Sequence, residues 1–408
     1  MLDIWKPIFL TLTVVMVAAQ MPGALAADET EMIEALKAQV EVLTTRLEAL
    51  EAIVARPVEQ TYSSPQTSNK VAAREWKERL RWKGDLRYRH ESFDVEDRRD
   101  RTRQRIRARA ALIADVNENV EVGFGLATGG DDPASTNQSL GDGFSTKAIQ
   151  LDLAYARWAS PIDGFDVIAG KFNNPFLRIG GNGLLWDGDL NPEGLALAFE
   201  RGAWFGSAVG LWLNEESRDE DSYLVGVQGG LNADLGDAVA LTAGIGYFNL
   251  LDLEGRPPIF DGDPRGNTLR ADGALAYGYE ELEAFAELNM DLGANTLSLF
   301  ADYVTNLDAS RYDTGYALGA RLEGKHNDRS WRFEYAYQDL EADAVYALLA
   351  DSDFAGGGTD GKGHIIKGGY ALTPRIGLKG TLFVTERGGN AGSEHDYNRL
   401  QLDISFKY

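Results

Sequence analysis

Hydrophobic and polar residues alternate with a period of two downstream of Trp76. Residues 79–91 show the pattern without a break, with Leu80 and Trp82 on one face and Arg81 on the other. Because successive side chains of a β-strand point to opposite faces, this period predicts strands that separate an apolar from a polar environment.

Segments of the same kind recur to the end of the chain, and clear examples lie at residues 151–156 and 239–247. In the first, Leu151, Leu153 and Tyr155 alternate with smaller or polar residues. We expect these three side chains to share one face of a strand.

A row of basic residues follows this period most sharply. Its members are Arg101, Arg103, Arg105, Arg107 and Arg109, and a preceding segment adds Arg81, Lys83, Arg87 and Arg89. At helical spacing the five arginines would spread around the cylinder, whereas in a strand they line up on one face. The strand is therefore favoured over a basic helix that binds nucleic acid or is simply solvated.

Residues 1–26 have the features of a secretory signal peptide. Lys6 precedes a 13-residue apolar run at 7–19, and a small-x-small site ends at Ala26. The run is shorter than the ~20 residues that a spanning helix needs, so cleavage is favoured over a retained anchor.

Residues 27–56 carry an apolar heptad seam. Its positions are Ile33, Leu36, Val40, Leu43, Leu47, Leu50 and Val54. The spacing predicts a short coiled-coil helix, and the alternative is an amphipathic helix packed on its own domain. The a and d residues favour two strands over three. The polar segment 57–75, with two prolines, is expected to be a flexible linker.

Residues 76–408 are expected to form an all-β membrane protein, an antiparallel transmembrane β-barrel of about 16 strands. Periodicity alone does not separate a barrel from a soluble sandwich, which would bury its apolar face instead. The export signal favours the barrel. No later apolar window is long enough for a spanning helix, and a closed barrel is the other structure that satisfies its own backbone in lipid.

The last strand strengthens this interpretation. Apolar residues fall on every second position from Leu400 to Phe406, and the chain stops in phase on Tyr408. This ending resembles the C-terminal signature of bacterial outer-membrane barrels. The resemblance implies that Phe406 and Tyr408 form the signal read by the barrel assembly machinery.

Several segments resemble the putative porin family of Gram-negative outer membranes. They are GDLRYR at 84–89, RQRIRAR at 103–109, STNQ at 135–138, LDLAYA at 151–156, GKFNNPF at 170–176 and WDGDLNPEG at 186–194. The order of signal peptide, coiled coil, linker and barrel is also similar to that family. The resemblance implies a porin-type channel in the outer membrane, assembled as a homo-trimer, with the N-terminal segment in the periplasm.

The lumen of such a barrel would carry the chemistry. The basic residues named above are expected to line the pore as one wall. Residues 173–194 have the position and length of an inward constriction loop, whose Asp187, Asp189 and Glu193 are expected to face that wall. Opposed charges at an eyelet select ions. The alternative is that loop carboxylates neutralise the arginines and merely fix the loop.

Composition removes other classes of function. The net charge of −23 repels a phosphate backbone, which argues against a nucleic-acid partner, and the absence of cysteine excludes disulfides and thiolate chemistry. The four histidines have no metal spacing. Asp187, Asp189, Asn191 and Glu193 recur as calcium ligands do, but Pro192 stands where a calcium loop needs glycine. We expect no metal and no cofactor.

Other acidic segments, 261–263 and 351–353, are expected to be ordinary outer loops. Enzyme motifs are incomplete, because the glycine-rich segment 356–362 is followed by Gly363 instead of Ser or Thr. We therefore expect a passive channel for small hydrophilic solutes or ions and no enzyme. The alternative functions are a plugged barrel that tethers the envelope through its coiled coil to the cell wall, and an outer-membrane hydrolase with a converging Ser and His.

Overall fold

The computed structural model describes residues 79–217 and 220–408. The expected signal peptide, coiled coil and linker, at 1–26, 27–56 and 57–75, lie outside the described residues. Within the described ranges, no helix has the length and apolarity needed to cross a membrane.

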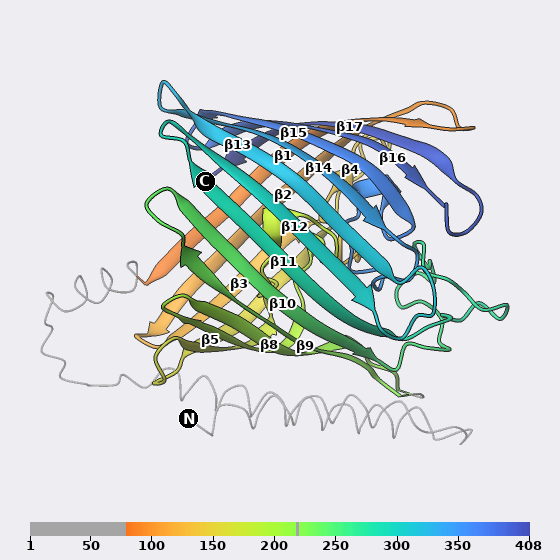
Figure 1. Cartoon of the computed structure of the whole chain (residues 1–408), viewed down its shortest axis with the longest axis horizontal. Helices are drawn as coiled ribbons and strands as arrows, with labels where there is room; N and C mark the ends of the chain where they lie inside the picture. Colours follow the sequence, from red (N-terminus) through yellow and green to blue (C-terminus); the bar gives the residue numbers. More distant parts are fainter. Residues whose placement is uncertain (1–78, 218–219) are drawn as a thin grey trace, which may run out of the picture. The chain divides into compact units, whose positions relative to one another are not determined.

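The described residues form a closed antiparallel β-barrel of 16 strands (Figure 1). The wall strands are β1 (Leu80–Val95), β2 (Arg101–Asn117), β3 (Val120–Thr128), β5 (Ile149–Ala159), β6 (Phe165–Lys171), β7 (Glu193–Arg201), β8 (Trp204–Asn214), β9 (Ser222–Asp234), β10 (Val239–Leu251), β11 (Tyr279–Asp291), β12 (Asn295–Asn306), β13 (Thr314–His326), β14 (Arg329–Leu340), β15 (Gly361–Thr373), β16 (Ile376–Arg387) and β17 (His395–Lys407). The short strand β4 (Gln138–Ser139) pairs with β2 beyond the point where the pairing of β3 with β2 ends. This architecture confirms the predicted antiparallel barrel of about 16 strands.

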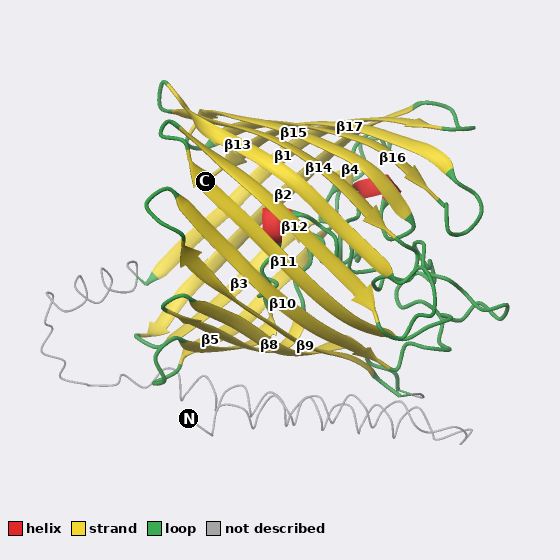
Figure 2. Cartoon of the chain, in the orientation of Figure 1, coloured by secondary structure: helices red, strands yellow, loops and turns green. Residues whose placement is uncertain are grey.

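Closure of the barrel joins the two ends of the sequence. Strand β1 pairs antiparallel with both β2 and β17, so no edge is left open. Short turns gather at the end where the C-terminus lies, and longer loops extend at the other end (Figure 2). In outer-membrane barrels the short turns are periplasmic and the long loops extracellular.

Strand parity places the charged rows inside. On β1, Trp82 is 61% exposed on the outer face, while Arg89 and Glu91 are buried in the lumen. The same parity puts the arginine row of β2 inside, with Leu112 outside. The alternation seen in these two strands is therefore read correctly from the sequence.

Strand β5 departs from the expected alternation. Gly125 of β3 pairs with Leu153, but the next residue, Leu126, pairs with Leu151, so Asp152 is an extra residue in the ladder. A β-bulge of this kind moves the following side chains to the opposite face. Leu151 consequently points outward and Tyr155 inward, and the prediction that they share a face is wrong.

Two loops fold into the barrel and form its hydrophobic core. Residues 172–192, between β6 and β7, include the 3-10 turn η1 (Ile179–Gly181), and residues 341–360, between β14 and β15, include η2 (Phe354–Gly356). Both 3-10 turns lie inside the wall in Figure 2. Their apolar side chains join inward residues of the wall in one cluster: Phe176, Leu184, Trp186, Val345, Leu348, Leu349, Leu224, Phe248 and Val304.

The chain leaves the wall at the end of β6, and a glycine permits the exit. Gly170 has φ +113, and a Cβ there would lie 2.2 Å from the carbonyl oxygen of Ala154. Only glycine adopts this conformation without strain. The turn directs Phe172 and the residues after it into the lumen, where Phe176 and Trp186 stack with ring centroids 5.2 Å apart.

Candidate functional site

The arginine wall is built by the pairing of β1 with β2. Arg87 lies opposite Arg107, and Arg89 lies opposite Arg105. Cations in register on neighbouring strands repel one another. The wall therefore requires carboxylates or solvent to compensate its charge, and the structure shows where these come from.

Carboxylates on the wall itself neutralise part of the row. Asp85 accepts hydrogen bonds from Arg107 at 3.0 Å and from Arg109 at 2.8 Å. Glu91, fully buried, binds Arg103 at 2.6 Å and also pairs with Arg399 of β17. These ion pairs bridge β17, β1 and β2 around the closure of the barrel.

Three members of the predicted wall lie at its margins. Arg81 pairs with Asp115 at 2.9 Å near the short-turn end. Lys83 lines a cavity of about 530 Å³ at that same end. Arg101 lies at the opposite end of β2, exposed, with its guanidinium carbon 5.9 Å from the ring centre of Phe93.

Of the three carboxylates expected on the inward loop, one meets the wall. Asp189 pairs with Arg107 at 3.0 Å and with Arg109 at 3.5 Å. Glu193 belongs to β7 instead of the loop, and it pairs with Lys171 of β6 at 2.9 Å. The loop therefore ends at residue 192, and the expectation that Glu193 faces the arginines is wrong.

Asp187 also faces away from the arginines, and it fastens the two inward loops together. Its two carboxylate oxygens accept the backbone N–H groups of Asp189 at 2.7 Å and Ser352 at 2.8 Å. Its own N–H donates to the carbonyl of Leu349 at 2.7 Å. Asp187 thus has a structural place between the loops, and the expectation that it faces the wall is wrong.

The second inward loop supplies a carboxylate that the sequence pattern did not reveal. Asp353 pairs with Arg89 at 2.9 Å and with Arg399 at 2.8 Å. Arg89 is also bound by Asp403 of β17 at 2.7 Å. The segment 351–353 is therefore inside the barrel, and its assignment to an outer loop is wrong. The apolar run at 344–350, buried inside the barrel, was the available signal.

Both loop carboxylates that meet the wall are held ionised. Burial by itself raises the pKa of Asp189, but Arg107 and Arg109 outweigh it and hold this pKa below the ordinary value. The pKa of Asp353 is likewise lowered, because Arg399 and Arg89 outweigh the effect of burial. The loops are thus attached to the wall by charge-assisted hydrogen bonds.

Two central arginines of the wall are left without a carboxylate partner among the described residues. Arg87 donates to the amide oxygen of Asn137 at 2.6 Å. Arg105 makes only long contacts, to the carbonyl of Asn137 at 3.4 Å and the hydroxyl of Ser135 at 3.5 Å. The Nε atoms of both side chains are buried and have no partner. These two guanidiniums therefore have no direct ion pair within the described part of the chain and keep free donors in the lumen.

The predicted assembly signal lies on the outer face at the short-turn end. Phe406 is half-exposed there. Tyr408 donates its N–H to the carbonyl of Gly84 at 3.1 Å and its hydroxyl to the carbonyl of Arg109 at 3.0 Å. Tyr408 is therefore hydrogen-bonded to both β1 and β2.

No metal centre is formed by the side chains of residues 79–217 and 220–408. The oxygen-bearing residues that recur at calcium-ligand spacing have other partners. Asp187 and Asp189 bind the groups given above, and the side-chain amide of Asn191 donates to Asp152 at 2.8 Å.

Comparison with known proteins places the chain among porins. A family model described as "Putative porin" matches residues 93–268 and 268–408. No curated protein matches the sequence. The high-pH structure of OprB from Pseudomonas putida superimposes with a TM-score of 0.55 at 12% identity, covering 84% of this chain and 97% of that chain.

A second solved structure is also similar. OmpF of Salmonella typhi, in a complex with daunomycin, superimposes with a TM-score of 0.51 at 10% identity, covering 81% of this chain and 97% of that chain. At these identities the likeness concerns the fold, and it agrees with the closed antiparallel wall described above.

Proposed function

Since the chain belongs to the putative porin family of outer-membrane channels, we propose that it is a passive diffusion channel for small hydrophilic solutes or ions with an arginine-lined lumen that favours anions. Solutes are sorted by size and by the field inside the barrel, without energy input. No residue is assigned a catalytic role, and no cofactor is needed.

The observation that carries the proposal is the imbalance at the centre of the wall. Arg87 and Arg105 have no carboxylate partner among the described residues, while Arg89, Arg103, Arg107 and Arg109 each have at least one. Buried charges are normally paired, so unpaired guanidiniums attract anions from solution. The neutralised arginines instead hold the loops. The row therefore contains both arginines that attract ions and arginines that fix the inward loops.

The test is the reversal potential of single channels in a planar bilayer under a KCl gradient. We expect Arg87→Ser and Arg105→Ser each to shift selectivity toward cations, and the double variant to lower the anion-to-cation permeability ratio severalfold. Arg201→Ser is the control, because Arg201 is exposed and pairs with Asp163 near a short turn. Unchanged selectivity in the double variant would contradict the arginine-lined lumen. A folded barrel without any ion flux would contradict the channel itself.

The proposal also covers export, assembly and location in the cell envelope. The signal peptide is cleaved near Ala26, the N-terminal segment lies in the periplasm, and the assembly machinery reads Phe406 and Tyr408. Three copies assemble in the outer-membrane lipid, although the heptad residues of 27–56 favour two. In this proposal, the coiled coil reaches the cell wall.

A second candidate function is an envelope-tethering barrel with little or no transport. It is favoured by the apolar core that 172–192 and 341–360 form inside the barrel, because packed side chains there reduce the space left for solute. The coiled coil would then carry the function, and the barrel would serve as its anchor.

A further inference from the structure

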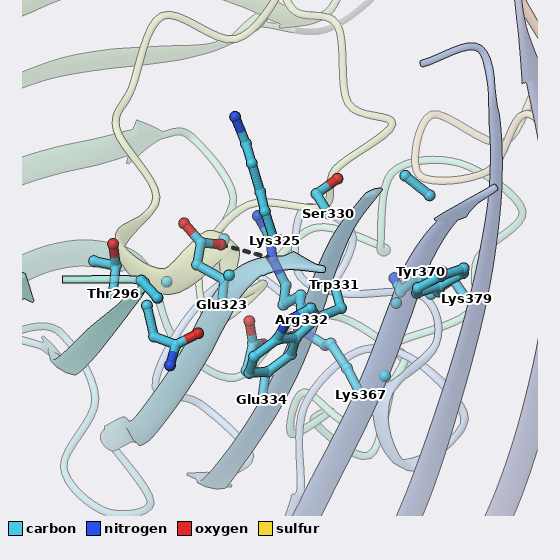
Figure 3. A pocket seen from close by; sticks show the side chains of 18 of the residues that line it. Thr296, Glu323, Lys325, Ser330, Trp331, Arg332, Glu334, Lys367, Tyr370 and Lys379 are labelled. Carbon is cyan, nitrogen blue, oxygen red and sulfur yellow. Dashed lines mark hydrogen bonds and ion pairs between the residues drawn. The ribbon is translucent and has the colours of Figure 1, made fainter. Parts of the chain in front are cut away.

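A cavity of about 680 Å³ opens at the short-turn end of the barrel. Residues of β12 to β16 and of the turn that precedes β12 form its lining, and Gly180 and Gly181 of the inward loop complete it. Figure 3 shows the charged side chains among them. A solute that has passed that loop would cross this cavity before it reaches the periplasm. We call it the periplasmic vestibule.

Six charged side chains line the periplasmic vestibule, and four of them are basic. They are Glu323, Lys325, Arg332, Glu334, Lys367 and Lys379. Both acids are already occupied: Glu323 accepts a hydrogen bond from Arg332 at 3.2 Å, and Glu334 accepts one from Lys367 at 2.8 Å. The remaining charge of the vestibule is therefore positive.

Lys325 and Lys379 carry this remaining charge. Neither ammonium has an ion pair or side-chain hydrogen bond with the described residues, and both side chains are exposed to the vestibule. In Figure 3, Lys325 extends away from the Arg332–Glu323 pair. Two free donors, one on β13 and one on β16, thus line the same cavity.

The neighbouring wall does not neutralise Lys379. Asp403 of β17 is its partner in the backbone register. The Asp403 carboxylate, however, is bound in a bidentate contact by Arg89, at 2.7 Å and 3.0 Å. Lys379 therefore continues the cationic wall of β1 and β2 toward the periplasmic mouth, with its own charge free.

We propose that the periplasmic vestibule is an anion-binding site for small carboxylates or phosphates, with Lys379 and Lys325 as its free ligands. An ammonium is a compact charge with three donors, so it suits oxyanions of either kind. Low-dielectric walls concentrate the field in such a cavity and raise the local anion concentration. The inference rests on the proposed channel and adds to it a binding step below the inward loop.

The electrical test measures block of KCl current at low ionic strength, where charges are least screened. Citrate and inorganic phosphate are added separately to each side of the bilayer. We expect both to block more strongly from the short-turn side, and citrate to act at lower concentration because it presents several carboxylates. Loss of one charge-assisted contact in Lys379→Ser should raise the half-blocking concentration about tenfold.

Matched variants separate the vestibule from general charge effects. Lys325→Ser should weaken block, the double variant should abolish it, and Lys379→Glu should reverse the preference toward cations. Lys147→Ser is the control, because Lys147 lies on the loop 129–148 at the other end of the barrel and contacts Ser145. If the wild type conducts but citrate block is absent, or is equal in the double variant, the vestibule site is refuted while the channel stands.

Binding is also measured without conduction. Calorimetric titration of citrate or phosphate into the folded barrel in neutral detergent should show binding to the wild type and to Lys147→Ser, and its loss in the double variant. Heat-modifiable gel mobility confirms that each variant is folded. Because this readout needs no current, failure of the channel proposal leaves the vestibule site testable, and equal binding to all variants would overturn it.

Discussion

At the scale of single residues, the lumen is organised by which arginines find a carboxylate. Strand parity alone places Arg103, Arg105 and Arg107 inside the barrel. It does not say that Arg107 meets Asp189 while Arg105 meets only neutral groups. That distinction depends on loops that return to the wall from distant parts of the chain, and it separates anchoring arginines from free ones.

The anchoring contacts should withstand moderate acid. Asp189 and Asp353 have pKa values below the ordinary carboxyl value of 3.8. For a group whose pKa is lowered on folding, the stabilisation is fully present above the unfolded pKa and is lost as pH falls through the folded one. We therefore expect the ion pairs of Asp189 and Asp353 with the wall, and the part of the single-channel conductance that depends on them, to stay constant from pH 7 to about pH 5.

The matched variant for this prediction is Asp353→Asn, which removes the charge at every pH. It leaves Arg89 and Arg399 without that partner, so the altered conductance that wild type shows only in strong acid should be present in the variant at pH 7. A wild-type conductance that changes between pH 7 and pH 5 while that of Asp353→Asn does not would contradict the lowered pKa of the two anchoring carboxylates.

At the scale of elements, the lumen depends on how the inward loops leave and re-enter the wall. Strand β6 is short because the chain turns inward after Lys171, and β7 resumes the wall at Glu193. Gly170 makes the first turn possible, since its backbone lies in a region that side chains disfavour and its neighbour leaves no room for a Cβ.

Gly170→Ala should therefore destabilise the folded barrel by about 1–3 kcal/mol. The measurement is the midpoint of guanidinium-induced unfolding in detergent, followed by the intrinsic fluorescence of the tryptophans. Gly210→Ala on β8 is the matched control, because no atom lies within 4 Å of its added Cβ. Equal midpoints for the two variants would mean that the exit from β6 tolerates a side chain.

Elements also show where periodicity misleads. The extra residue in β5 changes the face of Tyr155, and a bulge leaves no mark in the pattern of apolar residues. The segment 341–360 resembles an acidic surface loop at 351–353, yet the apolar run before it is buried against the first inward loop. Loop direction depends on packing partners, which adjacent residues do not specify.

At the scale of the whole molecule, the lumen has two unlike sides. An apolar core fastens both inward loops to the strands from β7 to β14, while their carboxylates reach the arginines of β17, β1 and β2. The core alone would suit a plugged anchor. The free cations of the wall and of the periplasmic vestibule are better explained by passage of anions.

Deletion of residues 28–56 distinguishes these two roles. In cells that lack the chain, we expect slower influx of a small anionic dye, and we expect the deletion variant to restore influx because the barrel is intact. Leakage of periplasmic protein reports envelope integrity in the same cells. If dye influx is the same with and without the protein, and the deletion variant still leaks periplasmic protein, the tethering function is supported and the channel function is contradicted.

The amino-acid pattern was sufficient for the barrel class, once the period of two was combined with the export signal and the last strand. It was also sufficient for the inward face of the arginine row, because alternation is a local property of any strand that carries no bulge. The tertiary structure decided which charges are neutralised, that a second loop enters the lumen, and that Lys325 and Lys379 share one cavity. These features arise from contacts between residues far apart in the chain, whose pairing is set by barrel closure and by packing of the inward loops.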